Sequence, residues 1–309
     1  MLPDGVELES RPCPLGCPPR DREVLTGRDR IGGRAGEFSI VQCATCGFMR
    51  TDPRPTPATM GHYYGDEYGP YASASANAPP PPAKLKLEQA LGLDMRRLPP
   101  VRPGRMLELG CAAGNYMALA RSLDWEVVGI EFSETAAQAA REKGFSVQAS
   151  AVEAAEPPRD PYDAIVAWMV LEHLHEPLEV LTRLRGWIRP DGYLVLSVPD
   201  AGSLDRRPLG NAWYALHLPN HLYHFTPASL RKLLAAAGWR VEKVRWQANP
   251  NNLLMSLSYR FDDRGMAGAA RAMRSLAHAP RWGKPRLALG WLLARLRQSG
   301  RMEVWARPA

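Results

Sequence analysis

Residues 105–116 read RMLELGCAAGNY and decide the fold, because a short apolar stretch runs directly into a glycine-containing loop. A helix is expected to follow this loop, and the first N–H groups of a helix have no partners within it. Glycine also lets the backbone of such a loop approach a ligand closely. The stretch therefore predicts the first strand and the ligand-binding turn of an α/β sheet.

The chain on either side of this loop alternates between helical and strand-like segments. Further strands are expected at 125–130, 145–149, 162–168, 193–198 and 239–246, and helices at 84–98, 115–123, 133–143, 178–187 and 226–238. Ser133 and Thr226-Pro227 are typical helix starts, and Gly144 and Gly238 are typical helix ends. This alternation predicts an α/β fold with a parallel sheet and helices on both faces.

Length and composition indicate a globular protein the size of an ordinary enzyme. The 309 residues are 45% hydrophobic and 23% charged, which argues against a disordered chain. No apolar run approaches the roughly 20 residues that cross a bilayer, and the N-terminus shows no secretory signal pattern. We therefore expect a cytoplasmic protein without a transmembrane segment.

Four of the five cysteines form two close pairs near the N-terminus. Cys13 and Cys17 are followed, after a turn-prone stretch, by Cys43 and Cys46. This arrangement is typical of a closed four-thiolate zinc site, which is structural because it leaves no open coordination position. Unrelated free thiols are the alternative, although apolar burial alone gives no reason for two close pairs.

These features divide the chain into three parts. Residues 1–55 are expected to form a small zinc-binding module, and 56–83 a Tyr-rich segment followed by the Pro-rich linker SASANAPPPP. Residues 84–309 would form the α/β domain, with a basic insertion at about 249–298.

A carboxylate after the second strand points to the ligand. Glu131 lies just over twenty residues beyond the glycine loop, where it can accept hydrogen bonds from both hydroxyls of a ribose. The loop reads E-x-G-x-x-x-G rather than G-x-G-x-x-G, which disfavours a nicotinamide dinucleotide. A nucleoside without phosphates fits these residues better.

Five stretches together resemble the class I S-adenosylmethionine-dependent methyltransferases. They read ELGCAAGNY, VVGIEFS, YDAIVAWMVLEHLHEP, IRPDGYLVLSVPD and PNHLYHFTPASLRKLLAAAGW. The paired cysteines followed by CGFMRTDPRP also resemble a bacterial subgroup with a zinc-ribbon-like module before the methyltransferase. The resemblance implies a Rossmann-like sheet of seven strands, closed by an antiparallel strand at 302–307 after the helical insertion.

The resemblance also implies the residues that bind S-adenosylmethionine. Glu108, Gly110 and Gly114 would hold the methionine portion, with Cys111 in the same loop. Glu131 and the adjacent Phe132 would contact the ribose, and the segment at Ser150 and Ala151 would contact the adenine. Trp168 would face the cofactor. Tyr64, and with it Tyr68, would cover the cofactor from the N-terminal side, although simple packing explains these tyrosines equally well.

Histidines are the expected proton acceptors, because methyl transfer to an acceptor releases one proton. His173 follows the fourth strand, and His221 and His224 precede the helix at 226. We expect His221 to be the base, with structural hydrogen bonding as the alternative for each histidine. His221 and His224 also have metal-like spacing, but the sequence offers no third ligand near them.

The basic insertion has two interpretations. Residues 250–298 carry nine Lys and Arg against two Asp, which is the whole net charge of +7. A wall of the acceptor pocket, with arginines contacting an anionic group, is one expectation. A peripheral membrane contact is the other, because Trp282, Leu287, Leu289, Trp291 and Leu292 are interleaved with the cations.

The expected function is methylation of a small molecule, most readily at oxygen. Carbon or nitrogen methylation of a sugar or metabolite is one alternative, and an RNA-directed enzyme or binding protein is another. The sequence AWMVLEH lacks the N/D-P-P-aromatic stretch that would hold a base amine, and Cys111 is in the wrong loop for attack on a pyrimidine. We therefore expect no nucleic-acid partner, and we make no prediction of the oligomeric state.

Overall fold

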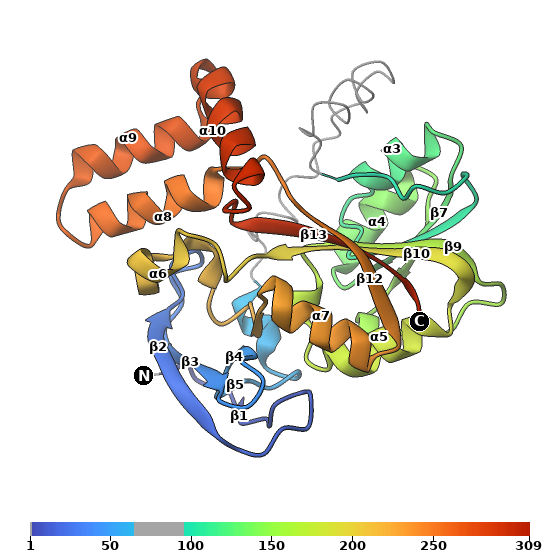
Figure 1. The fold of residues 1–309 in the computed structure, drawn as a ribbon, viewed down its shortest axis with the longest axis horizontal. Coiled ribbons are helices and arrows are strands. Elements are labelled where there is room, and N and C mark those ends of the chain that lie inside the picture. The colour runs from blue at the N-terminus through green and yellow to red at the C-terminus, as the bar shows by residue number, and fades with distance from the viewer. Residues whose placement is uncertain (1, 65–95) are drawn as a thin grey trace.

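A computed structural model describes residues 2–64 and 96–309 and contains the predicted seven-stranded sheet (Figure 1). The strand order is β12-β13-β10-β9-β6-β7-β8, and only β13 runs antiparallel to its neighbours. The strands are β6 (Arg105–Leu109), β7 (Glu126–Glu131), β8 (Ser146–Ala149), β9 (Tyr162–Trp168), β10 (Ile188–Pro199), β12 (Trp239–Trp246) and β13 (Arg301–Pro308). The predicted fold class is confirmed.

Helices cover both faces of this sheet and divide the core in two. Figure 1 shows α3 (Asn115–Arg121) and α4 (Glu134–Glu142) on one face, and α5 (Pro177–Arg185) and α7 (Pro227–Ala236) on the other. Successive residues of a strand point to opposite faces, so Met106 packs with the first pair of helices and Leu107 with the second. The continuous apolar strands of the sequence follow from this two-sided burial.

Two helix starts have the predicted caps. The Ser133 side chain accepts a hydrogen bond from the Ala136 N–H at the start of α4. At the start of α7, Thr226 and Ser229 form a reciprocal capping box, with Pro227 at the first helical position. Such caps satisfy N–H groups that the helix itself leaves without partners.

The N-terminal segment forms two small sheets. The strands are β1 (Leu8–Glu9), β2 (Asp21–Arg28), β3 (Glu37–Cys43), β4 (Met49–Thr51) and β5 (Arg54–Pro55). β1 pairs with β5, and β2, β3 and β4 form a second sheet whose fourth strand is β11 (Tyr223–His224). β11 belongs to the part of the chain that carries the main sheet, so the N-terminal segment and the α/β domain share a sheet.

The insertion between β12 and β13 is helical, as expected. It consists of α8 (Asn251–Asp262), α9 (Ala267–His278) and α10 (Gly283–Arg295). A bidentate ion pair joins it to the N-terminal segment, with Arg30 Nη2 2.9 Å from Asp263 Oδ2. None of the helices in the described parts of the chain is long and apolar enough to cross a membrane.

The remaining elements are short. They are α6 (Arg206–Leu209) and the 3-10 helices η1 (Met60–Tyr63), η2 (Val152–Ala154), η3 (Leu171–His173), η4 (Gly210–Ala212), η5 (Tyr214–Leu216) and η6 (Pro280–Trp282). Most of the helix expected at 84–98, all of the Pro-rich linker, and Tyr68 lie outside the described residues.

Candidate functional site

A cavity of about 850 Å³ lies at the carboxyl ends of four adjacent parallel strands. The turns after β6, β7, β8 and β9 contribute Gly110 to Ala113, Glu131 and Phe132, Ala151 and Val152, and Trp168 to Val170. Residues from η1, from η3 and the loop after it, from the η5 region and from the start of β13 also line it. This is the edge at which open α/β sheets bind ligands, and the volume suits a nucleoside-sized ligand together with a small second molecule.

The glycine loop has a backbone conformation that residues other than glycine rarely adopt. Gly110 has a φ of +63°, and a Cβ there would lie 2.6 Å from Cγ2 of Val170. Ala112 also has a positive φ, of +46°, and Gly114 adopts a left-handed conformation as the N-cap of α3. The loop therefore brings backbone rather than side chains to the cavity, and this leaves room for a ligand.

Glu131 is held in the cavity wall by two backbone donors. Its Oε2 accepts from the Ala112 N–H at 2.8 Å and its Oε1 from the Ser133 N–H at 2.9 Å. Burial raises the pKa of this carboxyl above its usual value, although the backbone hydrogen bonds act in the opposite direction. A carboxylate has about four acceptor positions, so two remain for ligand hydroxyls.

The predicted cofactor residues separate into two groups. Those that line the cavity are Tyr64, Gly110, Cys111, Glu131, Phe132, Ala151 and Trp168. Glu108, Gly114 and Ser150 lie behind this wall. Glu108 is buried, no described donor bonds its Oε2, and burial raises its pKa to about 8.

Two aromatic residues border the cavity in different ways. The Trp168 ring packs edge-on against Tyr116 with 5.0 Å between centroids, and its buried Nε1 has no partner among the described residues. Phe132 is 61% exposed and lies 6.4 Å from the Tyr64 ring, centroid to centroid. An indole N–H and an exposed ring at the same cavity are features that a bound aromatic base can use.

Three histidines meet in the cavity wall, and two of them, His173 and His221, are among those predicted from the sequence. The ring centroids of His173 and His221, and those of His217 and His221, are each 4.7 Å apart. Sequence reasoning missed His217, which lies four residues before His221 and has a φ of +40°. The four-residue spacing between His217 and His221 is the sequence feature that could have pointed to His217.

Backbone carbonyls fix the tautomers of His173 and His221. Nδ1 of His221 lies 2.9 Å from the Ala215 oxygen, and Nδ1 of His173 lies 3.0 Å from the Asn220 oxygen. A carbonyl oxygen only accepts hydrogen bonds, so each Nδ1 carries the proton and each Nε2 carries a lone pair. The hydroxyl of Tyr64, 2.7 Å from Nδ1 of His173, is then an additional acceptor.

Burial keeps these imidazoles neutral. It lowers the pKa of His173 to about 3 and that of His217 to about 4, and it also lowers the pKa of His221. At His173 and His221 the neighbouring histidines add to this effect. At neutral pH the cavity wall therefore presents neutral rings with lone pairs on Nε2.

The third predicted histidine, His224, lies outside the cavity wall. It belongs to β11, and its Nε2 is 3.3 Å from Oγ1 of Thr51 on β4. Thr51 Oγ1 also donates to the His221 backbone oxygen at 2.8 Å. In this position His224 contributes to the pairing of β11 with the N-terminal sheet.

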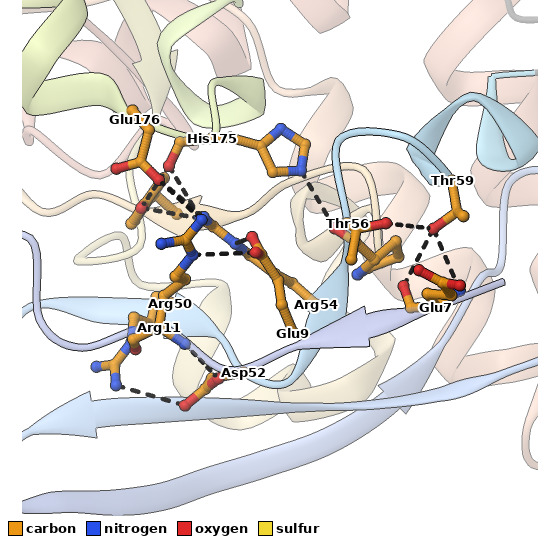
Figure 2. A network of polar contacts seen from close by, with 12 residues as sticks. Glu7, Glu9, Arg11, Arg50, Asp52, Arg54, Thr56, Thr59, His175 and Glu176 are labelled. Carbon is orange, nitrogen blue, oxygen red and sulfur yellow. Dashed lines mark hydrogen bonds and ion pairs between the residues drawn. The ribbon is translucent and has the colours of Figure 1, made fainter.

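A buried arginine ties the N-terminal segment to the loop that follows η3 (Figure 2). Arg54 Nε donates to Glu9 Oε1 at 3.0 Å, and its Nη1 donates to the His175 oxygen at 3.0 Å. The Tyr223 hydroxyl accepts from the same Nη1 and donates to the same carbonyl, each at 3.0 Å. His175 and Glu176 line the cavity, so this network fixes part of its wall.

The four N-terminal cysteines come together as predicted. Their sulfur atoms all lie within 4.8 Å of one another, and Sγ of Cys13 is 3.4 Å from Sγ of Cys46. Four sulfurs at about 2.3 Å from one zinc ion would be about 3.8 Å apart, so the cluster fits a tetrahedral ion with small adjustments. Cys111 lies apart from this cluster.

Another group of ligand-type atoms lies beside the cavity. Atoms of Glu172, His173 and His221 also lie within 4.8 Å of one another. Glu172 is fully buried, no described donor bonds either carboxylate oxygen, and burial raises its pKa to about 8. The structure thus supplies, near His221, the acidic neighbour that the sequence did not reveal.

The insertion contributes little to the cavity. Asn252 is its one residue in the wall, and the arginines of the insertion lie elsewhere in the described structure. The cations in the wall are Arg11, Arg96 and Arg301, and Nε of Arg301 is buried with no described partner. These three arginines are therefore the guanidinium groups that line the cavity itself.

Residues 85–244, just over half of the chain, match a family described as a methyltransferase domain. Trans-aconitate 2-methyltransferase of Methylobacterium radiotolerans is 36% identical over 110 residues, which cover 34% of this chain and 42% of that protein. Ubiquinone biosynthesis O-methyltransferase of Dinoroseobacter shibae is 27% identical over 187 residues, or 55% of this chain and 73% of that protein.

Two solved structures share the fold. The cyclase SpnF superimposes with a TM-score of 0.52 and 18% identity, covering 82% of this chain and 97% of its own. Phospholethanolamine N-methyltransferase 2 of Haemonchus contortus superimposes with a TM-score of 0.51 and 15% identity. The match covers 82% of this chain and 61% of that chain. At these identities the likeness concerns the fold alone.

Proposed function

Because the chain belongs to the methyltransferase-domain family, we propose that it transfers the methyl group of S-adenosylmethionine to a hydroxyl of a small molecule. One observation carries the proposal: Glu131 and the glycine loop face the same cavity as a cluster of neutral histidines. One of the two relatives named above adds support for oxygen as the acceptor atom, since its name specifies O-methylation.

The residues in the wall fit an adenosine-containing cofactor. Glu131 has acceptor positions left for ribose hydroxyls, the Trp168 N–H lacks a described partner, and Gly110 lets the loop backbone pass close to Val170, where a Cβ would clash. When bound, the sulfonium of the cofactor supplies a methyl group that is already activated for transfer. The task of the protein is then to align the acceptor, exclude water and take up one proton.

We assign the proton to the histidine cluster, with His221 as the acceptor. Its Nδ1 proton is held by the Ala215 carbonyl, so the lone pair of the ring is on Nε2. Nδ1 of His217 lies 3.3 Å from this Nε2 and engages its lone pair, so the acceptor hydroxyl is proposed to displace this contact when it donates its proton to Nε2. His173 and Tyr64 position the neighbouring wall through their short contact.

The four cysteines are proposed to hold one structural zinc ion. A closed set of four sulfurs suits zinc in preference to hard cations, which take oxygen ligands. The sheet shared through β11 supports a role for this module in building the cavity, since η1 follows β5 directly and supplies part of the wall.

Calorimetry with S-adenosylhomocysteine tests the cofactor site. We expect binding by the wild type and at least tenfold weaker binding by Glu131→Ala, because hydrogen bonds to a charged group contribute about 1.5–3 kcal/mol each. Glu134→Ala is the matched control, since this carboxylate belongs to the next helix and is 71% exposed. Folded wild type that binds neither cofactor nor product would contradict the proposal.

Transfer of a radiolabelled methyl group to a panel of hydroxyl compounds tests the proton acceptor. Once an acceptor is found, His221→Asn is expected to lower kcat about 10²- to 10⁴-fold while binding S-adenosylhomocysteine normally. His62→Asn, at an exposed residue outside the cavity wall, is the control. A fully active His221→Asn enzyme would remove His221 from the mechanism.

A further inference from the structure

Helix α10 exposes apolar side chains on the side that faces away from the protein. Leu287, Trp291, Leu292 and Leu296 are 41%, 40%, 49% and 60% exposed. On its inner side the helix packs closely, since a Cβ at Gly290 would lie 2.5 Å from the Ala248 oxygen. We call these four residues, together with the exposed Lys284 and Arg295 between them, the α10 outer face.

The sequence around this face is basic throughout. Residues 264–300 contain eight Lys and Arg and no Asp or Glu. The two acids just before this stretch are already paired, Asp262 with Arg274 and Asp263 with Arg30. Among the described residues, no ion pair joins Lys284 or Arg295 of the α10 outer face to an acidic side chain.

Aromatic rings and cations also contact each other on these helices. The Arg295 guanidinium lies 4.6 Å from the centroid of the Trp291 ring, and that of Arg281 lies 5.8 Å from the Trp282 ring. Tryptophan with adjacent arginine suits the boundary between lipid headgroups and acyl chains. There the polar end of each side chain contacts water or headgroups, and its apolar part contacts the acyl chains. Figure 1 shows α9 and α10 projecting away from the main sheet, where a flat surface can reach them.

We propose that the α10 outer face binds the surface of a bilayer that contains anionic lipid. Leucine and tryptophan side chains would enter the headgroup region, and Lys284 and Arg295 would meet the lipid phosphates. A helix of 13 residues is about 20 Å long, shorter than a hydrocarbon core of about 30 Å, so the helix lies in the interface. A second copy of this chain is disfavoured as the occupant, because it would bring two basic surfaces together.

Flotation of the purified full-length protein with vesicles tests this inference, which does not depend on the proposed reaction. We expect binding to phosphatidylcholine vesicles that contain phosphatidylglycerol, weak binding to phosphatidylcholine alone, and several-fold weaker binding at about 0.5 M salt than at about 0.05 M. Bound protein should also show tryptophan quenching by brominated lipid, and Trp291→Leu should reduce that quenching.

Two variants with matched controls localise the contact. Trp291→Ser with Leu292→Ser should reduce the vesicle-bound fraction at least tenfold, whereas Leu204→Ser, at a residue 67% exposed elsewhere, should not. Lys284→Gln with Arg295→Gln should weaken binding to anionic vesicles at least fivefold. The charge-matched pair Arg189→Gln with Arg240→Gln should leave it within twofold.

Three outcomes would overturn the inference. They are no binding of the wild type to anionic vesicles, equal binding to neutral vesicles, and equal losses in the control variants. Sedimentation equilibrium supplies a fourth: a wild-type dimer that Trp291→Ser with Leu292→Ser converts to monomer, without vesicle binding, would assign the face to self-association. Circular dichroism of each variant confirms that it is folded.

Discussion

At Gly110, both the backbone conformation and the surrounding space require glycine. We expect Gly110→Ala to destabilise the fold by about 2–3 kcal/mol and to weaken binding of S-adenosylhomocysteine at least tenfold, because the positive φ and the contact with Val170 both penalise a Cβ. Urea denaturation and calorimetry measure the two effects.

The reverse substitution two residues later is the control. Ala112 already has a positive φ, so Ala112→Gly relieves strain while adding freedom to the unfolded chain. These effects oppose each other, and we expect a change within about 1 kcal/mol and unaltered binding. Equal damage from both substitutions would show that the loop tolerates no change, whatever its backbone angles.

Single residues could be predicted from the sequence where chemistry and position in a motif coincide. Glu131 and Trp168 end strands, so their place at the sheet edge followed from the strands themselves. His217 and Arg301 could not be found in this way, because their place in the wall depends on how distant segments pack. For Glu108 the motif alone was not sufficient. It belongs to the glycine-loop motif, yet it is buried on β6 and does not line the cavity.

Among the elements, the two cysteine turns provide a direct test of the proposed zinc site. We expect one zinc ion per chain by elemental analysis, and its loss in Cys43→Ser with a marked fall in Tm, since metal binding contributes directly to folding. Cys111→Ser should retain the zinc, because this thiol lies outside the cluster. Wild-type protein purified without metal, yet equally stable, would refute the site.

Strand β11 should contribute to stability through Tyr223. Its hydroxyl bonds both Arg54 and the His175 carbonyl, so Tyr223→Phe leaves a buried carbonyl and a buried guanidinium short of a partner. We expect a loss of about 1–3 kcal/mol in the free energy of unfolding, read from the urea midpoint. Tyr193→Phe, which removes a hydrogen bond to the partly exposed Glu242, should cost less. A greater loss for Tyr193→Phe than for Tyr223→Phe would mean that the contact of Tyr223 with Arg54 and His175 contributes less to stability than its geometry indicates.

Elements whose sequence signals are local could be predicted, and an element that depends on a distant partner could not. Strand β9 has the bounds expected from the sequence, and α4 and α7 begin at the expected caps, because caps, glycines and apolar runs are local. The pairing of β11 with β4 has no such signal, since a two-residue strand becomes a strand only through a partner far away in the sequence. The N-terminal sheet was for this reason not predicted.

For the whole molecule, buried titratable groups predict a stability maximum near pH 6.5 in the absence of cofactor. His173, His217 and His224 have folded pKa values of about 3 to 4 against 6.5 unfolded, so below pH 6.5 the unfolded chain binds more protons and stability falls. Glu108 and Glu172 have folded pKa values of about 8, so stability also falls as the pH rises toward 8.

Each such group contributes a slope of about 1.4 kcal/mol per pH unit. Urea midpoints at pH 5.5, 6.5 and 7.5 should therefore be highest at the middle value. Glu172→Gln should flatten the alkaline side and steepen the acid side, because the amide does not ionise and the stability lost through Glu172 spans the range from its unfolded pKa of 4.5 to its folded pKa of about 8. Midpoints that do not change with pH would mean that these groups are solvated in the native state.

The strand contributed by Tyr223 and His224 also has a consequence for synthesis on the ribosome. Thr51 of β4 and His224 of β11 are 173 positions apart in the chain, so the edge of β4 is made long before its partner. At 5–20 residues per second, that interval is roughly 10–35 s. During it the nascent N-terminal sheet exposes an unpaired strand edge, a surface that templates pairing with another chain and favours aggregation when translation stalls.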